Sequence, residues 1–188
     1  MMTPGDLFRR ISTLLQHAGI PYMLTGSFAS SIYGMHRGSA DVDFIIDANE
    51  MGVSRLLDQL PKQDFYSDLN QALDAFRHQS TFNVMDHVTG FKIDFIFLKS
   101  RGFSQEEFHR RKQATVWGVP LYIATPEDIV LSKLEWAKLG KSSRQIEDAA
   151  GILKVRADEL VISYIEKWVA ELGLTSEWAR ARHMAGFE

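Results

Sequence analysis

The sequence predicts a mixed α/β fold, in which a small mixed β-sheet core is followed by a C-terminal helical subdomain. Two observations lead to this prediction. Up to residue 124, segments with apolar residues at helical spacing alternate with short runs rich in β-branched and aromatic residues, as expected for alternating helices and strands. From residue 125 onward only the helical spacing remains. We therefore expect two domains, a core over 1–124 and a helical subdomain over 125–188.

The N-terminal segment predicts a helix, a strand and a second helix. Residues 5–18 carry leucine and isoleucine at helical spacing, and Gly19 ends that helix. Residues 22–25 (YMLT) are typical of a short buried strand. The next helix is expected to begin at Ser27, directly after Gly26.

The middle of the chain predicts the rest of the core. Two apolar runs separated by Thr89-Gly90 indicate a hairpin. The expected helices cover residues 51–60, 70–79 and 104–113, and the expected strands cover residues 41–47, 81–88, 91–99 and a bent pair over 114–124.

The helical subdomain is expected to start at a strong N-terminal signal. Thr125 suits the N-cap position, and Pro126 suits the first position of the helix. The expected helices cover residues 125–140, 142–155 and 157–173.

Composition restricts the function and the compartment. The chain of 188 residues has a formal net charge of -3, so no overall basic field indicates nucleic-acid binding. It contains no cysteine, which excludes disulfides and thiolate metal sites. The N-terminus lacks the apolar region of a signal peptide, and no apolar run reaches the length of a membrane span. We expect a cytoplasmic protein that does not bind membranes.

Two carboxylates lie at the start of the strand expected over 41–47. Asp41 and Asp43 are two residues apart, so in a strand they point to the same face. Two like charges on one face repel each other unless a cation lies between them. The pair therefore indicates either a cation site or two solvated residues at a strand end.

A third carboxylate, Asp94, lies within the apolar strand expected over 91–99. A charge in such a strand costs free energy unless it is paired, hydrogen-bonded or bound to a metal. A salt bridge with Lys92 or Arg37 is one solution. A shared Mg²⁺ site with the carboxylates of the earlier strand is the other, because Mg²⁺ prefers carboxylate oxygens.

The Gly26-Ser27 pair, at the expected junction of strand and helix, indicates a phosphate site. A helix N-terminus presents free N–H groups to an anion, and a glycine lets a triphosphate approach the backbone. An ordinary helix N-cap explains the same two residues without a ligand.

Taken together, these motifs resemble the DNA polymerase β-like nucleotidyltransferase superfamily. The stretch "LTGSFASSIYGMHRGSADVDFII" is similar to bacterial minimal nucleotidyltransferases and AbiEii-type toxin enzymes. The resemblance covers most of residues 22–153. The residues that carry it are Gly26, Ser27, Asp41, Asp43, Asp94, Lys133, Arg144 and Asp148.

The resemblance implies a metal-dependent nucleotidyltransferase that moves a nucleoside monophosphate from a nucleoside triphosphate (NTP) to a hydroxyl and releases pyrophosphate. Asp41, Asp43 and Asp94 are the implied catalytic residues and the ligands of two Mg²⁺ ions. Asp94 would also act as the base for the acceptor hydroxyl.

The implied nucleotide-binding residues are Gly26, Ser27, Arg37 and Lys133. Lys133 is expected to face the aspartates with the triphosphate between them, although an exposed helix lysine explains it equally well. Arg37 could instead be a counter-ion of Asp41.

The implied acceptor is an RNA end such as that of tRNA, a protein hydroxyl or a small hydroxylated molecule. Two alternatives stay open. The chain could be a catalytically silent relative that binds a nucleotide or a partner protein, or a component of a toxin–antitoxin pair with a cognate antitoxin.

Overall fold

The computed structural model describes residues 3–34 and 38–187, and the chain divides into two compact units. We call the first the sheet unit; it extends to Thr25 and continues over Ser39–Ile123. We call the second the helical unit; it comprises Gly26–Gly38 and the chain from Ala124 onward. The segment Gly26–Gly38 thus groups with the C-terminal helices. The division into domains 1–124 and 125–188 stays a prediction.

The sheet unit is built on one mixed sheet, as the sequence predicts. Within the described residues the strand order is β3-β4-β5-β2-β1-β7-β6. The pairs β1–β7 and β2–β5 are parallel, and the other neighbouring pairs are antiparallel. The strands are β1 Tyr22–Thr25, β2 Asp41–Ile46, β3 Phe65–Tyr66, β4 Thr81–Asp86, β5 Lys92–Phe97, β6 Lys112–Val116 and β7 Val119–Ile123.

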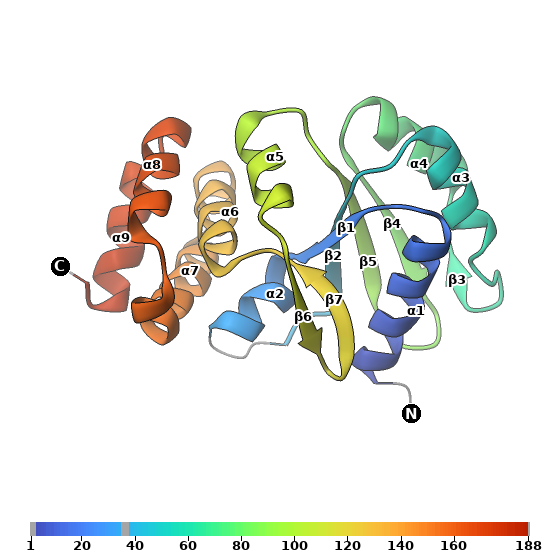
Figure 1. Ribbon diagram of the computed structural model, residues 1–188, viewed down its shortest axis with the longest axis horizontal. Helices are drawn as coiled ribbons and strands as arrows, with labels where there is room; N and C mark the ends of the chain where they lie inside the picture. Colours follow the sequence, from blue (N-terminus) through green and yellow to red (C-terminus); the bar gives the residue numbers. More distant parts are fainter. Residues whose placement is uncertain (1–2, 35–37, 188) are drawn as a thin grey trace. The chain divides into compact units, whose positions relative to one another are not determined.

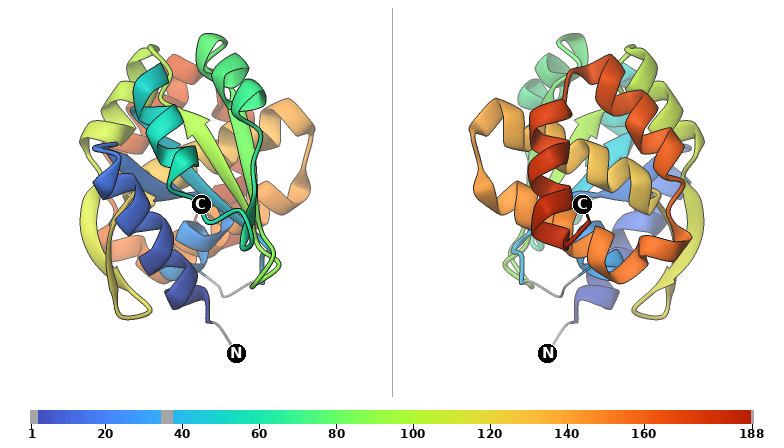
Figure 2. Two further views of the ribbon diagram at one scale, coloured as in Figure 1. Left: turned by 90° about the vertical axis from the view of Figure 1, so that its right-hand side faces the viewer. Right: turned by 90° about the vertical axis from the view of Figure 1, so that its left-hand side faces the viewer.

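Three helices of the sheet unit cover one side of this sheet. Helices α1, α3 and α4 lie in a row, with α3 in contact with both of the others (Figures 1 and 2). The helices of this unit are α1 Pro4–His17, α3 Glu50–Asp58, α4 Leu69–Arg77 and α5 Gly102–His109.

The core of the sheet unit on the side of α1 contains a cluster of aromatic rings. The ring of Phe44 on β2 meets Phe8 of α1 edge-on at 6.4 Å, and it stacks on Phe95 of β5 at 6.1 Å. Val42 and Ile46 share the face of Phe44 and are fully buried. The odd-numbered residues of β2 therefore point to the opposite face of the sheet, which carries the aspartates.

The helical unit packs closely around the end of helix α2. A Cβ added to Gly34 would come within 3.1 Å of the backbone nitrogen of Ile152 on α7, which is a tight contact. The predicted N-cap is confirmed, because the Thr125 side chain accepts a hydrogen bond from the Asp128 backbone nitrogen. The helices of this unit are α2 Gly26–Tyr33, α6 Pro126–Gly140, α7 Ser143–Arg156, α8 Ile162–Leu172 and α9 Thr175–Ala185, with a 3₁₀ turn at Ala157–Glu159.

Two predicted helices have the wrong bounds. The helix predicted over 104–113 ends at His109, because Lys112 begins β6 and pairs with Ile123 of β7. The helix predicted over 157–173 is interrupted at Leu160, whose backbone is extended, and α8 starts only after that. No helix in the part of the chain described here is both long and apolar enough to cross a membrane.

Candidate active site

The three predicted catalytic carboxylates lie on one face of two neighbouring strands. Asp41 and Asp43 are on β2, and β5 runs parallel beside it with Asp94 directly opposite Asp43. Residues that face each other in a strand pair point to the same side of the sheet. The expectation that Asp94 lies on an adjacent strand and on the same face is confirmed. The catalytic roles of the three residues stay a prediction.

The strand register extends this arrangement into a polar row across four strands. Thr25 at the end of β1 lies opposite Asp43, and Asn83 on β4 lies opposite Asp94. Thr25 is buried, whereas Asn83 is partly exposed. Sequence reasoning missed both residues, because their position depends on the pairing of strands that are distant in the chain.

A lysine lies between two of the carboxylates. The Nζ atom of Lys92 is 3.0 Å from Oδ2 of Asp94 and 3.4 Å from Oδ1 of Asp41. The salt bridge that the sequence offered as an alternative for Asp94 is therefore present. The hydrogen bond from the ammonium to Asp94 raises the pKa of Lys92.

The carboxylates have the chemistry that Mg²⁺ binding needs, but their side chains are not arranged around a metal position. Carboxylate oxygens are the donors that Mg²⁺ prefers. Yet among residues 3–34 and 38–187 no three Asp, Glu or His side chains are grouped so that they could hold a metal ion. The ammonium of Lys92 lies next to Asp41 and Asp94 instead. The binding of two Mg²⁺ ions stays a prediction.

The helical unit brings together three of the four predicted nucleotide-binding residues. Gly26 begins α2 with a φ of 68°, a backbone conformation that favours glycine. Lys133 of α6 reaches this helix start, where its Nζ lies 3.4 Å from Oγ of Ser27. Its main partner is Asp148 of α7, with Nζ 2.8 Å from Oδ2.

The Lys133 side chain is only 5% exposed, so its interpretation as a solvated surface lysine is wrong. Arg37, the remaining predicted nucleotide-binding residue, lies outside the described residues. Arg144 lies on α7 and is exposed.

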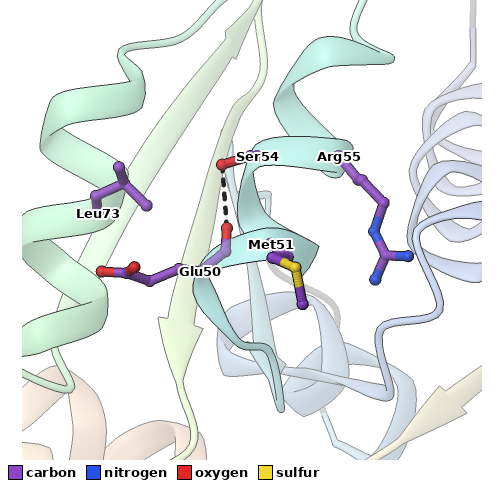
Figure 3. A pocket seen from close by; sticks show the side chains of 5 residues that line it. All are labelled: Glu50, Met51, Ser54, Arg55 and Leu73. Carbon is purple, nitrogen blue, oxygen red and sulfur yellow. Dashed lines mark hydrogen bonds between the residues drawn. The ribbon is translucent and has the colours of Figure 1, made fainter.

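A surface groove on the sheet unit is separate from the carboxylates. It lies between α3 and α4, on the helix-covered side of the sheet, whereas the carboxylates are on the other face. The Ser54 hydroxyl donates a hydrogen bond to the carbonyl oxygen of Glu50 along one wall (Figure 3). The residues that line the groove are Glu50, Met51, Ser54, Arg55 and Leu73.

Several solved structures have a similar fold. The antibiotic-resistance factor ANT(2'')-Ia matches with a TM-score of 0.55 and 13% identity over 95% of either chain. The lincosamide antibiotic adenylyltransferase LnuA, bound to lincomycin, matches with a TM-score of 0.56 and 13% identity over 82% of this chain and 98% of its own. An antigenic nucleotidyltransferase-like protein from Paracoccidioides brasiliensis matches with a TM-score of 0.54 and 16% identity over 92% of this chain and 90% of its own.

Comparison at the level of sequence gives no match: no family model and no curated protein matches the chain. The structural matches cover most of the chain, and the proteins matched share one fold. The chain therefore has the nucleotidyltransferase fold that its sequence motifs resemble.

Proposed function

We propose that the protein is a metal-dependent nucleotidyltransferase that transfers a nucleoside monophosphate from an NTP to a hydroxyl acceptor. One observation carries this proposal. Asp43 and Asp94 face each other on parallel strands, and Asp41 shares their face. Three carboxylates concentrated on one sheet face provide the oxygen donors that Mg²⁺ prefers, and Mg²⁺ also binds substrate phosphates.

The three carboxylates divide the chemistry between them. Asp41, Asp43 and Asp94 would hold Mg²⁺, and the ion would supply positive charge to the transferred phosphate and the leaving pyrophosphate. Asp94 accepts the proton of the acceptor hydroxyl. The hydroxyl oxygen forms a bond to the α-phosphorus, and the bond from that phosphorus to the pyrophosphate oxygen breaks. Positioning and charge compensation are the protein's main contributions in such reactions.

The start of α2 binds the triphosphate. Gly26 has no side chain to obstruct the approach of a phosphate, and Ser27 offers a hydroxyl. Lys133 supplies a positive charge beside Ser27. Asp148 fixes the direction of that lysine through its 2.8 Å ion pair. Arg37 is proposed as a further phosphate contact.

We favour a small hydroxylated molecule as the acceptor. Two of the similar structures belong to proteins described as an antibiotic-resistance factor and an antibiotic adenylyltransferase. The net charge of -3 provides no overall attraction for a long RNA. RNA ends and protein hydroxyls are tested alongside as the other acceptor classes.

A catalytically silent relative that binds a nucleotide or a partner protein is the second candidate. This candidate draws support from Lys92, whose ammonium balances the negative charge of Asp41 and Asp94 without a metal ion. Pairing with a cognate antitoxin stays a prediction.

Label transfer distinguishes these functions. The protein is incubated with Mg²⁺, each α-³²P-labelled NTP, and the small-molecule, RNA and protein fractions of a cell lysate. We expect label in the small-molecule fraction with wild-type protein and none with Asp43→Asn. Label in the RNA or protein fraction would change the acceptor class. If no fraction takes up label with any NTP, the silent relative is the better interpretation.

A further inference from the structure

Lys92 is a charged group beside the carboxylates to which the proposed reaction gives no role. It projects from β5 on the same face as Asp94, and Asp41 lies directly opposite it on β2. Its ammonium is within ion-pair distance of both, at 3.0 Å and 3.4 Å. It thereby links carboxylates from two different strands.

This ammonium occupies a position that a cation shared by Asp41 and Asp94 would need. A divalent ion bound to the same oxygens would repel the ammonium at such short range. Both cations cannot lie there together, so metal binding requires the lysine side chain to turn away.

The lysine is well suited to leave. Its side chain is 37% exposed and that of Asp41 is 55% exposed, so water and salt weaken their attraction. Its flexible four-carbon stem lets the ammonium move without a change of the backbone. The anionic phosphates of a bound NTP would offer the displaced ammonium a new partner.

We propose that Lys92 is an internal cation that competes with the divalent metal ion and so makes metal binding depend on the nucleotide. Without a nucleotide, Lys92 holds Asp41 and Asp94 and keeps metal affinity low. With the NTP present, its phosphates take over the ammonium and the carboxylates become free for the metal. This inference rests on the proposed function, because the NTP is the anion that releases the lysine.

Mn²⁺ binding, followed by electron paramagnetic resonance, tests the inference without any turnover or acceptor. Lys92→Met removes the charge and keeps most of the length of the side chain. We expect this variant to bind Mn²⁺ about tenfold more tightly than wild type in the absence of nucleotide, as the loss of two partly exposed ion pairs implies. A non-hydrolysable NTP analogue should then raise Mn²⁺ affinity less in the variant than in wild type.

Two control variants make the result specific. Lys92→Arg keeps the positive charge and should retain the weak Mn²⁺ binding of wild type. Lys99→Met removes an exposed lysine just beyond the other end of β5 and should change Mn²⁺ affinity by less than about twofold, because exposed charges at that distance are screened.

The inference is overturned if Lys92→Met binds Mn²⁺ no more tightly than wild type, if Lys92→Arg behaves like Lys92→Met, or if none of the proteins binds Mn²⁺. An active enzyme whose Mn²⁺ affinity is unchanged in Lys92→Met would contradict this inference and leave the proposed function standing. Tighter Mn²⁺ binding by Lys92→Met, in a protein that transfers no nucleotide, would support the competition between Lys92 and the metal ion and contradict the proposed function.

Discussion

Each unit of the molecule holds a lysine paired with aspartate, and the two pairs differ in their access to water. In the sheet unit, the Lys92 side chain is 37% exposed and shares its charge between Asp41 and Asp94. In the helical unit, the Lys133 side chain is 5% exposed and its partner Asp148 is 12% exposed. The first pair is open to exchange of partners, whereas the second is held inside the protein.

Exposure to water determines whether each lysine can leave its aspartate partner. An exposed ion pair contributes little to stability and can be broken at low cost. Breaking a buried pair leaves an uncompensated charge in the interior, which is expensive. Lys92 is therefore suited to leave its carboxylates during the proposed reaction, and Lys133 is suited to keep a fixed position beside Ser27.

The largest effect is expected for Lys133→Met. Removing the ammonium takes away the 2.8 Å ion-pair partner of the largely buried Asp148 carboxylate, so the free energy of unfolding should fall by about 3–5 kcal/mol. Urea denaturation measures this change. The double variant Lys133→Met/Asp148→Leu should recover part of the loss, because it removes the Asp148 carboxylate as well. If Lys133→Met lowers the free energy of unfolding no more than Lys92→Met does, the two ion pairs do not differ as their burial implies.

The next effect concerns the close packing of the helical unit. Gly34→Ala places a Cβ about 3.1 Å from the backbone nitrogen of Ile152, and backbone cannot move aside as a flexible side chain can. We expect a loss of about 1–3 kcal/mol in the free energy of unfolding. Gly140→Ala is the matched control, because a Cβ there meets no atom of the described residues within 4 Å. Equal denaturation midpoints for the two variants would show that α2 and α7 separate easily.

The helical unit should also lose stability at high pH through Tyr33. Burial raises the pKa of this phenol to about 12, from an ordinary value of 10.0. The unfolded chain therefore releases the proton at lower pH than the folded protein does, and the free energy of unfolding falls as pH rises from 10 toward 12. Tyr33→Phe should show a shallower fall over this range. Parallel curves for wild type and Tyr33→Phe in urea denaturation would contradict the burial of the phenol.

The smallest effect is expected for the stability of Lys92→Met. Its ion pairs are partly exposed, so the free energy of unfolding should change by less than about 1 kcal/mol at neutral pH. The pKa of Lys92 is raised, so this contribution is present below its unfolded pKa and is lost as pH rises through the folded value. A large loss for this variant in the same urea experiment would mean that Lys92 is a structural residue that cannot leave its partners.

Local signals in the sequence predict much of the fold. The apolar residues of DVDFII predict the strand, the two-residue spacing of its aspartates predicts their shared face, and Thr125-Pro126 predicts the start of α6. These features depend on neighbours in the chain, so the sequence alone suffices.

Contacts between distant segments could not be predicted in the same way. The helix signal over 104–113 is overridden where Lys112 pairs with β7. The ion pair of Lys133 with Asp148 depends on how α6 packs on α7. The contact of Lys92 with Asp41 depends on the register of two parallel strands. The sequence offered Lys92 as a partner of Asp94 because the two are close in the chain, but not as a link to Asp41.

The most direct test of the central claim is pyrophosphate release by aspartate variants, measured in the lysate fraction that accepts label. Asp94→Asn removes the proposed base, and Asp43→Asn removes its neighbour across the strand pair. Asp47→Asn is the control, since Asp47 is exposed just beyond the other end of β2. We predict that the rate falls about 10²–10⁴-fold for Asp94→Asn, falls comparably for Asp43→Asn and stays at the wild-type level for Asp47→Asn. Wild-type rates in all three variants would contradict this prediction.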